Sequence, residues 1–215
     1  MLHLLKTKQT TRIVAGFALA AGFLSIVGLF SKQGTFADLD AGIRTFVVGI
    51  QAPWLTSLLL LATWLGSTIQ LFVLGFVVVL MFAWLRRWKL LGIFLLAMVG
   101  QIALHLGFKA LFAIPRPQPL INYVIDDSYS FPSGHALAAT SFFGFLILVS
   151  IRWVNRPLTC IWIKVVGSVL IFLICFSRIY IGVHRPSDVL AGIIAAVIWI
   201  AALPLVPNNS VTTTE

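Results

Sequence analysis

Charged residues are scarce in this sequence. Lys, Arg, Asp and Glu together make up 10% of its 215 residues, and only 6 residues are acidic. A soluble domain carries about 25% charged residues, so the composition excludes an ordinary soluble protein. Apolar residues make up 60% of the chain, and the mean hydropathy is +1.05. We therefore predict an integral membrane protein.

Cysteines are also few, and internal repeats and low-complexity segments are absent. The 2 cysteines, Cys160 and Cys175, fall on one predicted helix, which separates them by about 22 Å at the rise of an α-helix. They are too far apart to pair, so we expect two core thiols and neither a disulfide scaffold nor a zinc site. Because the polar gaps between apolar runs are short, we predict one domain over residues 1–215.

The excess of basic residues gives a net charge of +9. These residues sit in short clusters between apolar stretches rather than along one soluble face. Such a distribution is typical of membrane topology signals. We therefore expect the lipid bilayer as a partner and no nucleic acid, whereas the oligomeric state is left open.

Long apolar runs predict the fold class, since a helix needs about 20 apolar residues to cross the hydrocarbon core. The predicted spans cover residues 13–31, 67–85, 90–113, 134–151, 158–178 and 186–206. The first run is too long for the core of a signal peptide. We predict an all-α, polytopic membrane bundle of six transmembrane helices.

The region between the first two spans has a different character. Residues 36–50 mix Asp38, Asp40 and Arg44 with apolar residues at helical spacing, which is typical of a helix that lies in the membrane interface. Residues 53–65 are apolar but short, so we expect a second interfacial or partly inserted helix. A full crossing here is the alternative, and it would raise the count to seven.

The basic residues predict the orientation when the N-terminus is placed in the cytoplasm. The inner segments then hold Lys6, Lys8, Arg12, Arg86, Arg87, Lys89, Arg152, Arg156 and Lys164. The outer segments hold Lys32, Arg44, Lys109, Arg116, Arg178 and Arg185. Because the inner set is larger, we predict that both termini are cytoplasmic.

The first motif places Lys109 at the end of the third span and Arg116-Pro117 in the loop that follows. An arginine gives bidentate contacts to an anion and a lysine supplies a point charge. The pair can therefore bind a phosphate. The alternative is two basic side chains that snorkel at the end of a span.

The second motif is Pro132-Ser133-Gly134-His135, directly before the fourth span. Ser133 is a candidate N-cap, and the N–H groups of the first helical turn form an anion site. Gly134 lets the backbone approach a phosphate closely, and His135 is placed beside it. The alternative is a plain helix cap followed by an interfacial histidine.

The third motif is Ser177-Arg178, followed by His184 and Asp188 at the start of the last span. An Asp in the first helical turn can accept the Nδ1–H of an imidazole four residues earlier and leave Nε2 available to attack, as in a Ser-His-Asp triad. The alternative is an acid that stabilises a helix N-terminus. Under the predicted topology, all three motifs meet at the outer surface.

Together these motifs resemble the complete three-part signature of the type 2 phosphatidic acid phosphatase superfamily, with no signature position substituted. The resemblance implies a lipid phosphatase with a phosphohistidine intermediate: His184 attacks, Asp188 orients it, and His135 acts as acid and base. It implies phosphate binding by Lys109, Arg116, Ser133, Gly134 and Arg178. No cofactor and no metal are expected, because the outer face lacks the clustered ligands of a two-metal site.

The substrate and three further residues remain open. Phosphatidylglycerophosphate and undecaprenyl pyrophosphate are the substrates that bacterial members of this size suggest, with phosphatidic acid and diacylglycerol pyrophosphate as further candidates. A lipid phosphotransferase that uses the same phosphohistidine and a non-catalytic membrane protein are the alternatives. Asp126 and Asp127 belong to a solvated loop or have a role in substrate binding or gating, and His105 lines the pocket or makes a polar contact in the bundle.

Overall fold

The computed structural model describes residues 2–123 and 128–205, in which every regular element is an α-helix. The helices are α1 (Leu2–Lys32), α2 (Ala37–Gly49), α3 (Pro53–Leu65), α4 (Thr68–Trp84), α5 (Trp88–Phe112), α6 (Gly134–Trp153), α7 (Pro157–Ile181) and α8 (Pro186–Ala201). The predicted all-α class is confirmed. Each predicted span coincides with one helix whose ends differ by a few residues, except that α1 begins at Leu2 rather than at residue 13.

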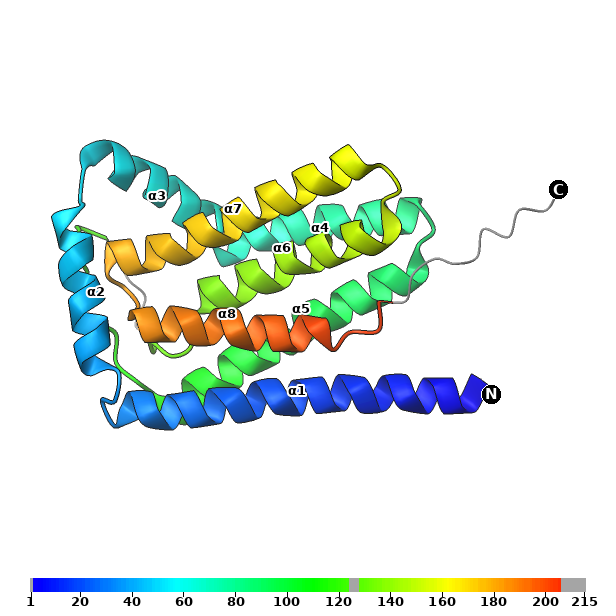
Figure 1. Cartoon of the computed structure of the whole chain (residues 1–215), viewed down its shortest axis with the longest axis horizontal. Helices are drawn as coiled ribbons and strands as arrows, with labels where there is room; N and C mark the ends of the chain where they lie inside the picture. Colours follow the sequence, from blue (N-terminus) through cyan, green and yellow to red (C-terminus); the bar gives the residue numbers. More distant parts are fainter. Residues whose placement is uncertain (1, 124–127, 206–215) are drawn as a thin grey trace.

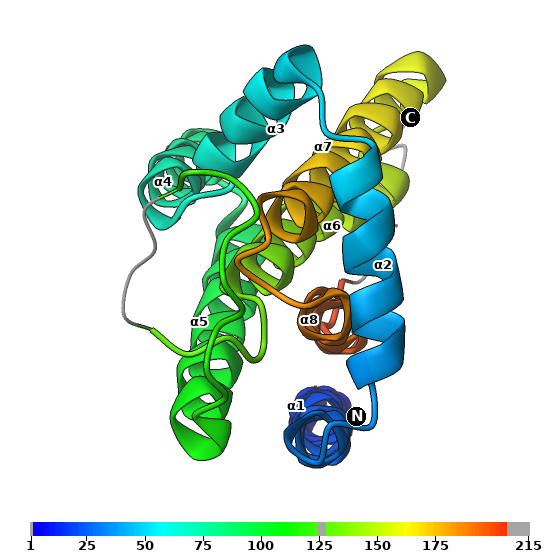
Figure 2. The same cartoon turned by 90° about the vertical axis from the view of Figure 1, so that its left-hand side faces the viewer.

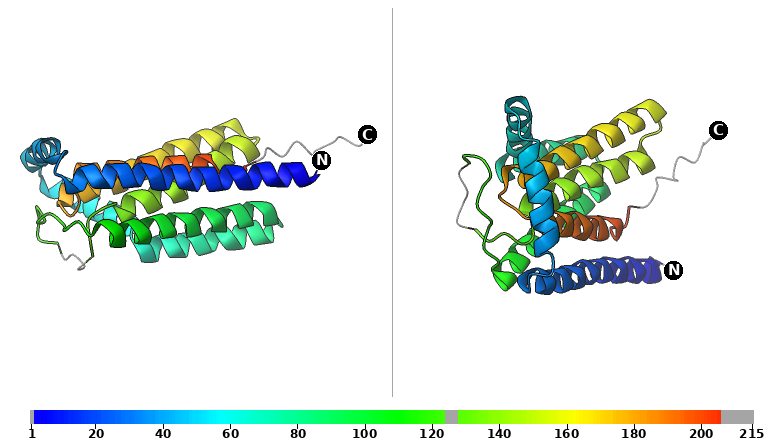
Figure 3. Two further views of the ribbon diagram at one scale, coloured as in Figure 1. Left: turned by 90° about the horizontal axis from the view of Figure 1, so that it is seen from below. Right: turned by 60° about the vertical axis from the view of Figure 1, so that its left-hand side comes forward.

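The long helices run side by side, and α2 lies across one end of them (Figure 1, Figure 3). Helix α6 is central, because it packs against α5, α7 and α8, while α1 covers α8 and α5. Aromatic rings fill the space between α5 and α6: Phe94 meets Phe142 and Phe145 at centroid distances of 5.9 and 5.3 Å. The core therefore lies around α6 and supports the end of the bundle that α2 covers.

Four helices are long and apolar enough to cross a membrane: residues 7–32 of α1, then α5, α6 and α7. Helices α3 and α4 form a bent pair with an angle of 54°, which passes the same test as one broken span. Helix α8 is apolar but has only 16 residues. Composition and length thus support four or five crossings, and the predicted six are not confirmed.

Large apolar side chains face outward along the bundle. Phe72 of α4 is 74% exposed, and Leu19 of α1 and Phe172 of α7 are similarly uncovered. Exposed apolar surface of this extent is typical of a surface that contacts a membrane. The predicted multi-pass membrane protein is the interpretation that these helices support.

Both predicted interfacial segments are helices. Figure 2 shows α2 across the end of the bundle, beside α8, which is seen end-on. Helix α3 has the predicted bounds of residues 53–65 and packs against α7. Counting α3 and α4 as one broken span, with its bend of 54°, raises the number of crossings that length and composition support from four to five.

The two cysteines lie on α7, as predicted, and neither forms a disulfide. Cys175 is buried and fits the predicted core thiol. Cys160 is half-buried near the opposite end of the helix, so the description as a core thiol holds only in part.

Candidate active site

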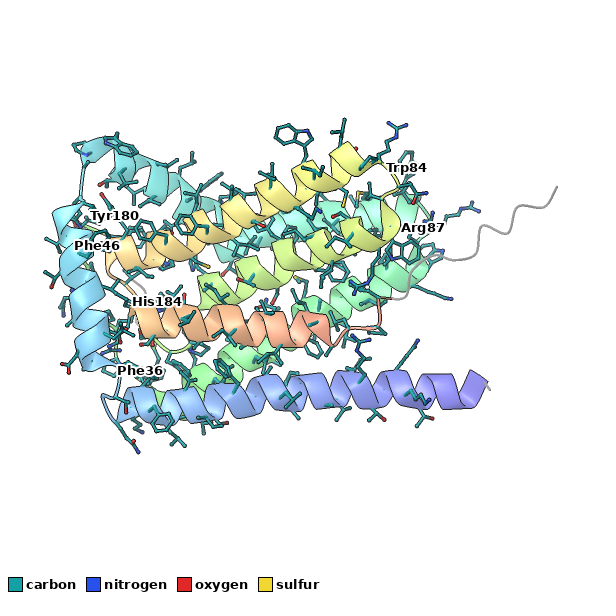
Figure 4. All side chains as sticks on the ribbon, in the orientation of Figure 1. Phe36, Phe46, Trp84, Arg87, Tyr180 and His184 are labelled. Atoms are coloured by element: carbon teal, nitrogen blue, oxygen red, sulfur yellow. The ribbon has the colours of Figure 1, made fainter. Side chains whose placement is uncertain are left out.

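The residues of the three motifs converge at the end of the bundle that α2 covers. Lys109 and Arg178 lie in the last turns of α5 and α7, whereas His135 and Asp188 lie in the first turns of α6 and α8. Figure 4 shows His184 at this end, between α2 and the start of α8. The fold therefore brings together side chains that are up to 79 residues apart, from Lys109 to Asp188.

A tight turn places His184. Helix α7 ends at Gly182, whose φ of +84° is left-handed and suits a residue without a side chain. The Leu120 N–H donates to the Ile181 carbonyl at 2.7 Å and fixes the preceding loop against this turn. Pro186 then begins α8 at its first position, where its missing N–H costs nothing. His184 lies between these two constraints and is 3% exposed.

Ser128 connects the two cations of the first motif. Arg116 donates from Nε to the Ser128 carbonyl at 2.8 Å and from Nη2 to the Ser128 hydroxyl at 2.7 Å. Lys109 Nζ donates to the same hydroxyl at 3.0 Å. The two cations are thus held together, an arrangement that suits an anion. Sequence analysis alone does not identify Ser128, because a single serine in a polar loop resembles any other.

Arg116 also contacts the imidazole of His184. Its Nη1 lies 2.9 Å from His184 Nε2 and 3.2 Å from the Val183 carbonyl. A guanidinium has donors only, so Nε2 must accept this hydrogen bond. The proton of the neutral ring is therefore on Nδ1, and the lone pair of Nε2 points toward the cations.

The surroundings keep His184 neutral. Burial lowers the pKa of His184 well below its ordinary value, because the charged form loses its hydration. Positive charges nearby lower this pKa further, in the order Arg178, Arg116, His135 and Lys109. A neutral imidazole with an available lone pair is the form that can act as a nucleophile.

Asp188 lies next to His184, but the predicted direct hydrogen bond is wrong. Asp188 Oδ2 is 3.9 Å from His184 Nδ1, which is too long for a hydrogen bond. The same oxygen accepts bonds from the Ser130 hydroxyl at 2.5 Å and the Arg185 N–H at 3.0 Å. The Ser130 hydroxyl is also 3.4 Å from His184 Nδ1, so a third residue stands between the two.

The second motif differs from its prediction in two details. Ser133 occupies the N-cap position of α6, but its buried hydroxyl caps nothing and contacts no polar partner within residues 2–123 and 128–205. A Cβ at Gly134 would collide with the ring of His105. Gly134 is thus required where α5 approaches α6, with His105 of α5 against the start of α6. That His105 lines the pocket stays a prediction.

Arg178 is buried, with 4% of its surface exposed. Its Nη1 donates to the hydroxyl of Thr63 on α3, and its guanidinium carbon lies 5.7 Å from the ring centroid of Tyr123. An aromatic face at this distance stabilises a cation. The buried guanidinium is thus fixed by an element that carries no motif residue.

Helix α2 closes the site from the outside. The Asp40 carboxylate accepts hydrogen bonds from the N–H and hydroxyl of Ser187, at 2.9 and 2.7 Å. Arg44 donates to the carbonyls of Gly182 and Gln118. A cavity of about 240 Å³ remains between α2 and the α7–α8 turn, with His184 in its wall.

Asp126 and Asp127 lie outside the described residues. Within the described ranges, no group of three or more His, Cys, Asp or Glu side chains is arranged to hold a metal ion.

The profile of the PAP2 superfamily matches residues 90–211, the part of the chain that carries all three motifs. The chain belongs to the PAP2 superfamily. Phosphatidylglycerophosphatase B of Bacillus subtilis (strain 168) is 28% identical over 179 residues, which cover 79% of this chain and 84% of that protein. An undecaprenyl-diphosphatase of Sulfolobus acidocaldarius is 35% identical over 113 residues, half of each chain.

A solved structure supports the same fold. The crystal structure of a transmembrane PAP2-type phosphatidylglycerolphosphate phosphatase from Bacillus subtilis superposes with a TM-score of 0.72. The match covers 89% of this chain and 94% of that one, at 24% identity. The predicted family is confirmed, and with it the predicted enzyme class, a lipid phosphatase.

Proposed function

We propose that this PAP2 protein removes phosphate from a membrane lipid through a phosphohistidine formed at His184, without a metal ion. The observation that carries the proposal is the buried, neutral His184, whose Nε2 lone pair faces a group of cations. A neutral nucleophile surrounded by positive charge suits attack on an anionic phosphorus. The same charges stabilise the oxygens of the transition state.

In the first step, His184 Nε2 attacks phosphorus, the new N–P bond forms and the P–O bond to the lipid breaks. His135 gives its proton to the leaving oxygen. Lys109, Arg116 and Arg178 neutralise the other phosphate oxygens together with the first-turn amides of α6, next to Ser133 and Gly134. Arg116 must shift its bond from Nε2 to the phosphate, which the larger negative charge of the phosphate favours.

In the second step, His135 takes a proton from water, and the water oxygen attacks phosphorus. The N–P bond breaks, inorganic phosphate leaves, and His184 returns to its neutral form. His135 thus acts first as an acid and then as a base. Asp188 stabilises the positive imidazole that exists between the two steps.

The proposed substrates are phosphatidylglycerophosphate and undecaprenyl pyrophosphate. The names of two relatives support this choice. The cavity beside His184 also supports it, because two arginines in its wall, Arg44 and Arg185, outnumber the one acidic residue there, Asp40, and add positive charge beyond the motif residues. The apolar chains of such a lipid can remain in the bilayer while the phosphate enters.

The proposed topology has six crossings, with both termini in the cytoplasm and the site at the outer face. The start of α1 and the end of α8 lie at the end of the bundle opposite α2 (Figure 1), which requires an even number of crossings. This opposite end carries Trp84 and Arg87 (Figure 4). Exposed basic side chains lie in or beside the α4–α5 and α6–α7 connections and favour a cytoplasmic location for this end: Arg86, Arg87, Lys89, Arg152 and Arg156.

The test is phosphate release by the purified, EDTA-treated protein in detergent. The panel holds phosphatidylglycerophosphate, undecaprenyl pyrophosphate, phosphatidic acid and diacylglycerol pyrophosphate, with His184→Ala as the control. We expect metal-independent release that disappears in the control. Transfer of the phosphate to an acceptor other than water would replace the phosphatase by a phosphotransferase. Equal rates on a water-soluble monoester would contradict the choice of a lipid.

A further inference from the structure

Ser130 lies between the two residues that are expected to act as a pair. It is fully buried, and its hydroxyl is 2.5 Å from Asp188 Oδ2 and 3.4 Å from His184 Nδ1. The direct distance from Nδ1 to Oδ2 is 3.9 Å. The shortest polar route from the imidazole to the carboxylate therefore passes through this hydroxyl.

The donors and acceptors on this route can be assigned. Arg116 has donors only, so His184 accepts at Nε2 and carries its proton on Nδ1. A carboxylate only accepts, so the Ser130 hydroxyl donates to Asp188. The lone pairs of the Ser130 oxygen are thus available to accept a hydrogen bond from the Nδ1–H of His184. The 3.4 Å separation is long for a hydrogen bond, as catalytic contacts often are before substrate binds.

The backbone holds Ser130 in this place from two sides. Its N–H donates to the Ile114 carbonyl, beyond the end of α5, at 2.7 Å. Next to it, Phe131 is fully buried and packs edge-on against Phe112 at 5.6 Å. On the other side, the Ser133 N–H donates to the Asp188 carbonyl at 3.1 Å. The hydroxyl is therefore fixed relative to both α5 and α8.

We propose that Ser130 is a positioning residue that holds the Nδ1–H of His184 and connects it to Asp188. This inference rests on the proposed function, in which Nε2 attacks phosphorus. When the N–P bond forms, the imidazole becomes positive and its Nδ1–H becomes a stronger donor. The Ser130 hydroxyl, polarised by its bond to Asp188, accepts that bond. No proton is transferred along the route, and Nδ1 keeps its hydrogen throughout.

The kinetic test compares substitutions at Ser130 with a control serine. Ser130→Ala removes the hydroxyl, Ser130→Cys replaces it with a nearly isosteric weak donor, and Ser130→Thr keeps it. Ser141→Ala is the control, since Ser141 is a fully buried α6 serine without a hydrogen-bond partner in the described part of the chain. For Ser130→Ala and Ser130→Cys we expect kcat to fall about 10- to 100-fold while KM stays within about twofold. The Thr and control variants should keep most of kcat.

The second test is independent of activity. The nitrogen-15 chemical shifts of His184 in histidine-labelled protein, assigned by comparison with His184→Gln, report which ring nitrogen carries the proton. We expect protonation at Nδ1 in both the wild type and Ser130→Ala, because Arg116 still donates to Nε2. The Nδ1 shift itself should change in Ser130→Ala, because the Nδ1–H loses its acceptor. Unchanged shifts, an unchanged kcat, or a rise in KM alone in Ser130→Ala would each overturn the inference and leave lipid hydrolysis standing. No phosphate release by the wild type would overturn the proposed function instead, while the shifts still test Ser130.

Discussion

Two regions of the molecule meet at the site, and they contribute in different ways. Helices α5–α8 and the loops between them carry every motif residue and, apart from the first two residues of α5, fall within the part that matches the PAP2 superfamily. Helices α2 and α3 lie outside that part and carry no motif residue. Yet Asp40 and Arg44 of α2 and Thr63 of α3 hydrogen-bond to the motif segments. The motif region is proposed to carry out the chemistry, and α2 and α3 help to fix the positions of its reacting groups.

This difference has a physical reason. The reacting groups are charged or bear lone pairs, and within a low-dielectric site they must be held at fixed positions to be effective. Arg178 is buried at the end of α7, and Thr63 of α3 accepts a hydrogen bond from its Nη1. The first turn of α8 likewise needs acceptors for its N–H groups, and Asp40 supplies one from α2.

The largest effect is expected from the motif region, at His135. His135→Ala should lower phosphate release from lipid about 10²- to 10⁴-fold, because it removes the general acid and base. With a nitrophenyl phosphate, whose leaving group needs no proton, an acid-labile phosphoenzyme should accumulate. The measurement is radiolabel retained on the protein.

His184→Ala is the matched control for this experiment, and it should retain no label. Label in both variants would place the covalent bond elsewhere, and turnover of His135→Ala close to that of the wild type would remove His135 from the mechanism.

Asp40→Asn tests the supporting region. The amide keeps an acceptor for one Ser187 donor but loses the charge that binds both. A hydrogen bond to a charged group contributes about 1.5–3 kcal/mol, so we expect a lower melting temperature in detergent. The start of α8 carries Asp188, and loosening it should lower kcat/KM about tenfold.

Asp38→Asn provides the control, since Asp38 lies on the same helix but is exposed. Both substitutions remove one negative charge from α2. If the two variants have equal activities and melting temperatures, α2 acts through its charge alone and the contact with Ser187 is irrelevant.

The sequence predicts the helices and the site residues of the motif region, but it does not predict the contacts that α2 and α3 make with that region. Apolar runs located the helices within a few residues, except that α1 begins at Leu2 rather than at residue 13. The residues before 13 are largely polar, and a hydropathy profile detects only the part of a helix that is apolar, so it misses this extension. The three motifs were expected at one surface because span ends alternate between two sides, and the structure places them together.

Ser130 and Thr63 could not be found from the sequence. One is a serine in a loop and the other a threonine in an apolar helix, and neither residue type is unusual in its surroundings. Their importance arises from partners 58 and 115 residues away. The sequence places Asp40 on a predicted interfacial helix, but it does not predict the hydrogen bond to Ser187, which lies 147 residues further on. Such pairings depend on packing, which the periodicity of a single helix does not encode.

A smaller effect is expected in the pH dependence of kcat/KM. Burial at the α7–α8 turn, together with the motif cations, lowers the pKa of His184 well below its ordinary value. The neutral nucleophile therefore persists at lower pH, and the acid limb of kcat/KM should lie well below pH 6.5. A histidine with an ordinary pKa of about 6.5 would be only about a quarter neutral at pH 6. We expect the rate at pH 6 to exceed that fraction clearly, and a limb centred near 6.5 would contradict a buried, neutral His184.

The smallest effect is expected at Thr63, where the two regions touch through one hydroxyl. Thr63→Val keeps the shape of the side chain and removes the acceptor of Arg178 Nη1. A single hydrogen bond contributes about 1 kcal/mol net, so kcat/KM should fall roughly three- to fivefold. Thr56→Val is the control, because Thr56 lies on the same helix and bonds to Tyr180 at 2.7 Å without touching Arg178.

A double-mutant cycle with Arg178→Lys separates positioning from general stability. A lysine cannot reproduce the fixed fork of a guanidinium, so it does not hold the contact with Thr63. If Thr63 acts through Arg178, adding Thr63→Val to Arg178→Lys should cost little more, because residues that share one interaction are not additive. Additive losses of kcat/KM would mean that Thr63 supports the fold in general and does not position Arg178.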